Sequence, residues 1–144
     1  APAMTLAMIG FAATLNLLNV DAFIVHQNVA RSSGHKELDV SYLASLSDDA
    51  VPALANTIQA SSLAPSLQEG VIASLRCHQY EHQTGSSDQR SWQSFHLSHW
   101  RAPRIYDQQA ESLEAYTIND EDWPATVTSP TGRVFECENA FGWD

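Results

Sequence analysis

The sequence predicts a mainly α-helical fold: a small bundle of about four helices, with a long apolar helix at its N-terminus and an irregular tail or short β-hairpin at its C-terminus. Three observations support this prediction. The first 20 residues carry no charged side chain, apolar residues then recur at helical spacing, and this periodicity disappears from Tyr116 onward. We therefore expect an apolar N-terminal segment (1–31), a helical domain (32–115) and a C-terminal extension packed on it (116–144).

The apolar N-terminal segment is just long enough to be the end of a transmembrane helix, since a spanning helix needs about 20 apolar residues. Asn16 and Asn19 fit the point where such a helix leaves the membrane and meets water. We expect one continuous exit helix as far as Arg31, ended by the Ser-Ser-Gly run at 32–34. A secretory signal peptide fits poorly, because there is no basic n-region and no clear cleavage site. A buried helix of a soluble protein is the remaining alternative.

Two short helices are expected next. Residues 38–46 carry apolar side chains at helical spacing, and Ser47 is a typical N-cap for the helix that follows. Asp48 and Asp49 would then lie in the first turn, where negative charge complements the helix dipole. This second helix should run to about Ala60.

Two longer helices and a hairpin complete the prediction. Residues 65–83 carry apolar side chains at four-residue steps, and a further helical pattern runs over 88–113. Pro103 should kink or restart this last helix, because proline lacks the backbone N–H. Residues 126–128 and 133–137, separated by a Pro-Thr-Gly turn, are typical of a small β-hairpin.

The charge balance excludes one class of partner and indicates a side of the membrane. Acidic residues outnumber basic ones by 17 to 7, which gives a formal net charge of −10. Such a chain repels phosphate backbones, so we expect no nucleic acid partner. Few basic residues follow the apolar segment, whereas cytoplasmic flanks are normally rich in lysine and arginine. This pattern favours an extracytoplasmic location for the domain.

The chain has two cysteines, Cys77 and Cys137, and their spacing matches no metal or redox motif. In an oxidising compartment they could form one long-range disulfide bond. In a reducing compartment they would be two buried thiols. The sequence leaves both possibilities open, because pairing depends on the distance between the two Cα atoms.

Histidines supply the pattern that most strongly suggests chemistry, ahead of a loose calcium site at residues 120–122. His78, Glu81 and His82 form the order H-x-x-E-H, in which two histidines on one helix face grip zinc and the glutamate polarises a water. A second possibility is a zinc site made by His78 and His82 together with His96 and His99 from the next helix. The simpler interpretation is that these are hydrogen-bonded histidines at the end of a helical hairpin, with no cofactor.

Three stretches resemble a known family: 19–31, 38–54, and 92–98 followed by Arg101-Ala102. They are similar to the C-terminal soluble part of bacterial polytopic membrane proteins grouped as domain-of-unknown-function families 4153 and 4173. The middle stretch carries most of the resemblance, through its Leu-Asp, Tyr-Leu, Leu-Ser and Asp-Ala-Val-Pro-Ala-Leu elements in order.

The resemblance implies several membrane-spanning helices before this domain and a helical domain outside the membrane of a bacterial cell. It implies no activity. Val20 stands where relatives usually have proline, which favours a continuous exit helix. His96 and His99 stand where relatives commonly have Asn and a basic or polar residue, which favours a hydrogen-bonding role over metal binding.

The leading hypothesis is a non-enzymatic, extracytoplasmic interaction or sensing domain of a multi-pass bacterial membrane protein. It would meet the membrane through its apolar helix and bind a protein partner or a second copy. The alternatives are a metal-dependent hydrolase that uses His78, Glu81 and His82, and a structural subunit of a larger membrane assembly. Trp92 is expected in the core. A polar network should tie the exit helix to the domain through five residues: Asp21, Asn28, Arg31, Asp39 and Tyr42.

Overall fold

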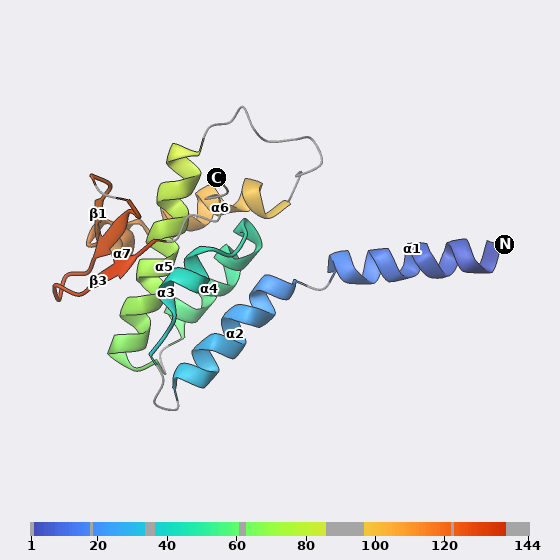
Figure 1. Ribbon diagram of the computed structural model, residues 1–144, viewed down its shortest axis with the longest axis horizontal. Coiled ribbons are helices and arrows are strands. Elements are labelled where there is room, and N and C mark those ends of the chain that lie inside the picture. Colours follow the sequence, from blue (N-terminus) through green and yellow to red (C-terminus); the bar gives the residue numbers. More distant parts are fainter. Residues whose placement is uncertain are drawn as a thin grey trace.

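The structure, a computed structural model, describes residues 2–17, 19–33, 37–60, 63–85, 97–121 and 123–137. Within them lie seven α-helices, one 3-10 helix and one small sheet (Figure 1). The helices are α1 (Pro2–Leu17), α2 (Val20–Ser32), α3 (Val40–Ala44), η1 (Asp48–Ala50), α4 (Val51–Gln59), α5 (Pro65–Thr84), α6 (Leu97–Gln108) and α7 (Ala110–Glu114). The prediction of a mainly helical fold is confirmed.

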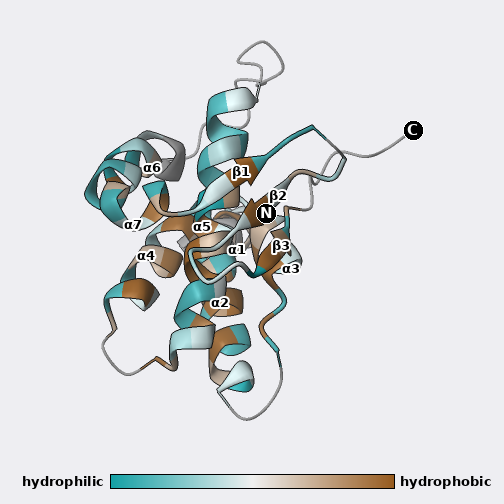
Figure 2. Ribbon diagram, turned by 90° about the vertical axis from the view of Figure 1, so that its left-hand side faces the viewer, coloured by the Kyte–Doolittle hydropathy of each residue, from teal (hydrophilic) through white to brown (hydrophobic). Residues whose placement is uncertain are grey.

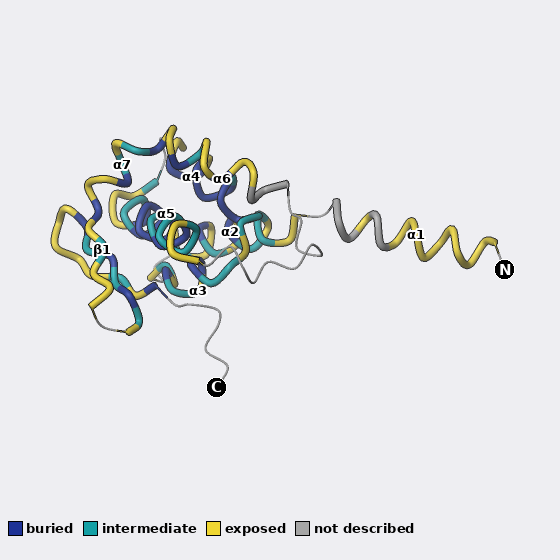
Figure 3. Tube along the Cα trace, turned by 90° about the horizontal axis from the view of Figure 1, so that it is seen from above, coloured by how far each residue is buried: buried dark blue, intermediate teal, exposed yellow. Residues whose placement is uncertain are grey.

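Helix α5 forms the centre of the domain. It packs against α3, α4, α7 and the sheet, and in Figure 3 it lies among these elements. Val71 and Leu75 are completely buried along it, as the four-residue steps of the sequence predicted, and Cys77 is completely buried as well. Each such aliphatic side chain contributes roughly 1.5–3 kcal/mol when it is fully removed from water. The burial of α5 therefore makes a large contribution to the stability of the fold.

Capping residues set the short helices before α5. Asp39 accepts a hydrogen bond from the Tyr42 backbone N–H at 3.0 Å and begins α3. The Ser47 hydroxyl accepts from the Asp49 N–H at 3.3 Å and begins η1, which leads directly into α4. The predicted Ser47 cap and the helix end near residue 60 are both confirmed, while α3 is shorter than the predicted 38–46 helix.

The prediction of one long N-terminal helix was wrong. Helix α1 ends at Leu17 and α2 begins at Val20. Asn19 has a non-helical backbone, and its side-chain Oδ1 accepts from the Ala22 N–H at 2.8 Å. An asparagine that caps a new helix in this way cannot also continue the previous one. No helix in the described ranges is both long and apolar enough to cross a membrane.

Helix α6 continues through Pro103, and the restart comes later than predicted. The backbone leaves the helical region at Gln109, with φ −103° and ψ 9°, and α7 follows. Pro103 lies on the exposed side of α6. Water can therefore hydrate the carbonyl group that proline leaves without a donor. The expected start of this helix near residue 88 lies outside the described residues, as does Trp92.

The C-terminal part forms a three-stranded antiparallel sheet in the order β1-β2-β3. Its strands are β1 (Thr117–Asn119), β2 (Thr126–Thr128) and β3 (Val134–Glu136). The β2–β3 pair confirms the predicted hairpin, and Gly132 takes a positive φ of 86° in its turn. Strand β1 was not predicted. The strands carry hydrophobic residues beside α5, as Figure 2 shows.

A disulfide bond joins α5 to the end of the sheet. Cys77 and Cys137 are bonded, with their Cα atoms 5.5 Å apart and a sequence separation of 60 residues. Both cysteines are completely buried. The bond closes a long loop that includes α6, α7 and the sheet, so it restricts the unfolded chain strongly.

Reduction of this disulfide should lower the free energy of unfolding by about 2–4 kcal/mol, because the loop that it closes is long. Urea unfolding with and without a reductant measures the difference. A Cys77→Ala/Cys137→Ala double variant is the control and should not respond to the reductant. An unchanged unfolding midpoint on reduction of the wild-type chain would contradict the prediction.

Candidate functional site

The C-terminal half of α5 carries the residues that the sequence singled out for chemistry. His78 is 3% exposed, and its Nε2 lies 3.0 Å from the Leu43 carbonyl oxygen. Burial lowers the pKa of His78, while the hydrogen bond to Leu43 and the carboxylates of Asp48 and Asp21 act in the opposite direction. This imidazole is part of the core and links α5 to α3.

Glu81 lies one turn further along α5 and is partly buried. Desolvation, with a smaller contribution from the Asp48 carboxylate, raises the pKa of Glu81 to about 7. Its Oε1 atom is buried and has no hydrogen-bond partner among the described residues. Glu81 is therefore poised to change its charge near neutral pH.

Tyr106 of α6 lies beside the same end of α5. Its hydroxyl is also buried without a described partner. Burial raises the pKa of Tyr106, and the negative charges of Asp48 and Glu81 add to the effect. The His82 ring lies 5.8 Å from the Tyr106 ring, centroid to centroid. We call Asp48, His78, Glu81, His82 and Tyr106 the α5 polar cluster.

The described residues around α5 do not form a metal site. No three histidine, cysteine, aspartate or glutamate side chains within the described ranges are placed to hold a metal ion. His96 lies outside these ranges, and the side chain of His99 is not described. The four-histidine zinc site therefore stays a prediction, and His78 in its present position is committed to Leu43.

A second polar group fastens α2 to η1. The Asp21 carboxylate accepts hydrogen bonds from the Ser47 N–H, at 3.0 Å, and from the Ser47 hydroxyl. The Asn19 Nδ2 donates to the Asp49 carbonyl oxygen at 3.0 Å. We call these four residues the α2–η1 junction. Because Asn19 also caps α2, the residue that separates α1 from α2 is itself anchored to the domain.

The other residues of the predicted polar network make local contacts. Asn28 donates from Nδ2 to the Ile24 carbonyl oxygen of its own helix at 3.0 Å. Asp39 caps the helix that contains Tyr42, and Arg31 is exposed near the end of α2. The structure thus connects Asp21 to the domain at Ser47 rather than through Asn28 and Arg31. Ser47 and Asn19 were recognised only as a cap and as a polar residue of the exit helix.

The comparisons concern this same part of the chain. Residues 1–57 match the family model DUF4153, described as a domain of unknown function. This match confirms the resemblance to DUF4153 that the stretches 19–31 and 38–54 carry, while the third stretch lies beyond the matched residues. No curated protein and no solved structure matches the chain. The DUF4153 match covers α1, α2, α3 and most of α4, and it therefore includes the whole α2–η1 junction.

Substitution of Asp21 by alanine should cost about 1 kcal/mol of stability, because the Ser47 N–H and hydroxyl lose their charged acceptor. Substitution of Asn28, which bonds only within its helix, should cost a few tenths of this amount. Urea unfolding of both variants measures the difference. A larger loss for Asn28→Ala than for Asp21→Ala would show that the DUF4153 segment is not held at this junction.

A Glu81→Gln variant should show how the pKa of Glu81 affects stability. Because this pKa is raised from 4.5 to about 7, the folded state holds the proton more tightly than the unfolded state. The wild-type chain should therefore lose about 1 kcal/mol, relative to the variant, as the pH rises from 4.5 through 7, after allowance for the partial exposure of the carboxyl group.

Thermal or urea unfolding of the two proteins from pH 4 to pH 8 tests this prediction. The effect of His78 is present in both proteins and cancels in the difference. Glu111→Gln, at an exposed position of α7, makes the same change of charge and is the control. A stability difference between Glu81→Gln and wild type that does not vary with pH would contradict the assignment.

Proposed function

We propose that this chain is a non-enzymatic, extracytoplasmic interaction or sensing domain of a multi-pass bacterial membrane protein, and that α1 is the part that meets the membrane. The exposure of α1 carries this proposal. Five large apolar side chains of α1 are between 61% and 73% exposed, and Figure 3 shows the helix extending away from the domain. They are Met4, Leu6, Met8, Ile9 and Phe11.

The free energy of this exposure is large. Each of these side chains would gain about 2 kcal/mol from complete burial, so the five together leave on the order of 10 kcal/mol unrealised in water. Isolated exposed apolar residues are common, but a continuous set of this kind marks a lipid or protein contact. Lipid is the occupant that we propose, because residues 1–20 carry no charge on any face of the helix.

The location outside the cytoplasm rests on two further features. A buried disulfide such as Cys77–Cys137 is typical of oxidising compartments. The residues after the apolar segment are poor in lysine and arginine, whereas cytoplasmic flanks are rich in both. The junction of Asn19 and Asp21 with η1 would hold the domain close to the point where α1 meets the membrane.

The purified chain should float with phosphatidylcholine vesicles, and a Leu6→Glu/Phe11→Glu variant should bind them at least tenfold more weakly, because two charges enter the apolar surface of α1. The matched control is Val134→Glu, which changes an equally exposed residue of β3 (62% exposed) and should bind as the wild type does. Flotation at several lipid concentrations measures the affinity.

Equal vesicle binding by the Leu6→Glu/Phe11→Glu variant and the wild type would overturn the proposed role of α1. A wild-type chain that ignores vesicles but forms a dimer, which the same substitutions abolish, would instead favour the structural subunit of a larger assembly. Alkylation of Cys77 and Cys137 tests the compartment in cells that are acid-quenched and then denatured, since both side chains are buried in the folded chain. Labelling of both cysteines without prior reduction would contradict the extracytoplasmic location.

A further inference from the structure

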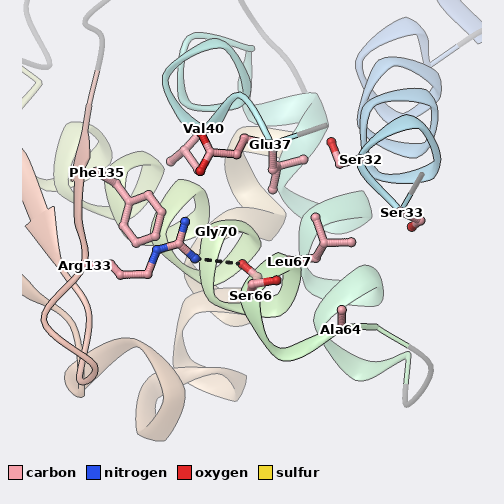
Figure 4. A pocket seen from close by; sticks show the side chains of 11 residues that line it. Ser32, Ser33, Glu37, Val40, Ala64, Ser66, Leu67, Gly70, Arg133 and Phe135 are labelled. Carbon is pink, nitrogen blue, oxygen red and sulfur yellow. Dashed lines mark hydrogen bonds between the residues drawn. The ribbon is translucent and has the colours of Figure 1, made fainter. Parts of the chain in front are cut away.

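A pocket of about 460 Å³ lies at the other end of α5 from the polar cluster. It is enclosed by the end of α2, the segment before α3, the first turns of α5 and strand β3 (Figure 4). Pockets of about 300–1,000 Å³ commonly hold small molecules. Eleven residues line it: Ser32, Ser33, Glu37, Leu38, Val40, Ala64, Ser66, Leu67, Gly70, Arg133 and Phe135.

The floor of the pocket is apolar. Leu38 and Val40 approach α5 closely at Gly70, where an added Cβ atom would lie 3.0 Å from Leu38 Cδ2 and 3.2 Å from Val40 Cγ2. Leu67 and the Phe135 ring complete this floor. A ligand that fills the pocket would therefore cover its apolar part with hydrocarbon.

Arg133 forms the cationic wall of the pocket, and neighbouring residues hold its side chain in place. Arg133 Nη1 lies 3.3 Å from Glu69 Oε2 and donates to the Ser66 carbonyl oxygen at 3.4 Å, and the guanidinium carbon lies 5.1 Å from the Phe135 ring centre. Hydrogen bonds from Ser129 and Thr131, together with Arg133, lower the pKa of Glu69. Both hydrogen bonds of the Arg133 guanidinium within the described part of the chain use Nη1, so the donors on Nε and Nη2 can bind a carboxylate.

Glu37 forms the anionic wall of the pocket. Glu37 lines the pocket from the segment before α3, and its side chain is exposed. It makes no ion pair with any cation of the described ranges. Ser32 and Ser33, at the C-terminal end of α2, line another side of the pocket, where the carbonyl dipoles of the helix end contribute further negative potential.

We propose that this pocket binds a zwitterionic ligand with an apolar body, namely a short apolar peptide with free ends. Glu37 would take its ammonium group, Arg133 its carboxylate, and the floor of Leu38, Leu67 and Phe135 its side chains. Glu37 would repel a purely anionic ligand, and Arg133 would repel a purely cationic one. The pocket is separate from α1, so this inference does not depend on the proposed membrane contact.

The dipeptide leucyl-leucine is a suitable probe. It should bind the full chain with a Kd on the order of 1 mM, as expected for a ligand of this size in a site with few polar groups. Its N-acetylated form lacks the ammonium group, and its C-terminal amide lacks the carboxylate. Each of these analogues should bind at least tenfold more weakly, as measured by NMR titration or calorimetry.

The variant Glu37→Gln identifies the group that recognises the ammonium. It should weaken leucyl-leucine at least tenfold and leave the weak binding of the N-acetylated form unchanged. Ala64→Trp, at an exposed position on the rim, should fill the pocket and abolish binding. Glu111→Gln removes an exposed carboxylate elsewhere and should bind as the wild type does.

The same titration on the Leu6→Glu/Phe11→Glu chain separates the pocket from α1, and binding there should equal that of the wild type. Loss of dipeptide binding in that chain would overturn the pocket assignment and leave α1 as the binding element. Equal binding of the dipeptide and its N-acetylated form would also overturn the assignment, as would wild-type affinity in Glu37→Gln. So would the absence of any binding to the wild-type chain at dipeptide concentrations up to about 10 mM.

Discussion

The burial of α5 is the constraint on which the rest of the structure depends. The 20-residue helix α5 buries every residue from Gly70 to Leu75, and six consecutive residues occupy all sides of a helix, so α5 needs a partner on more than one side. Helices α3 and α4 cover one part of its surface, and α7 with the sheet covers another. The Cys77–Cys137 bond then fastens the end of the sheet to the same helix. Helix α4, which packs on α5, in turn receives α2, η1 and α6.

The two ends of α5 carry two different kinds of site. Near its N-terminal end, Gly70 allows Leu38 and Val40 to approach, and a pocket remains between them and β3. Near its C-terminal end, the Asp48 carboxylate of η1 acts to raise the pKa values of Glu81 and His78. The same short η1 helix receives Asn19 and Asp21. The fold thus brings the start of α2, the helix that follows α1, onto η1, and the Asp48 carboxylate of η1 acts electrostatically on His78 and Glu81.

Local physics explains which predictions succeeded. Ser47 followed by two aspartates is a strong helix start whatever surrounds it, and the stripe from Leu67 to Leu75 determines one face of α5 without knowledge of its neighbours. The β2–β3 hairpin follows from a turn that needs a positive φ at Gly132. Strand β1 has only three residues and pairs with a strand nine residues later, so it leaves little pattern in the sequence.

The break between α1 and α2 and the partner of Asp21 depend on contacts between residues that are distant in sequence. Asn19 can sit within a helix or cap a new one, and its bond to Asp49, 30 residues away, accompanies the second arrangement. Asp21 found Ser47 instead of the expected partners because packing decides which side of α2 faces the domain. The amino-acid sequence alone determined the helical class, the apolar and uncharged N-terminal segment, the bounds of the helices between Ser47 and Thr84, and the acidic character, since these follow from nearest neighbours along the chain. Only the tertiary structure decided the disulfide, the pairing of Asp21 with Ser47, the raised pKa of Glu81 and the pocket between Glu37 and Arg133, because each requires residues distant in sequence to meet at a few ångströms.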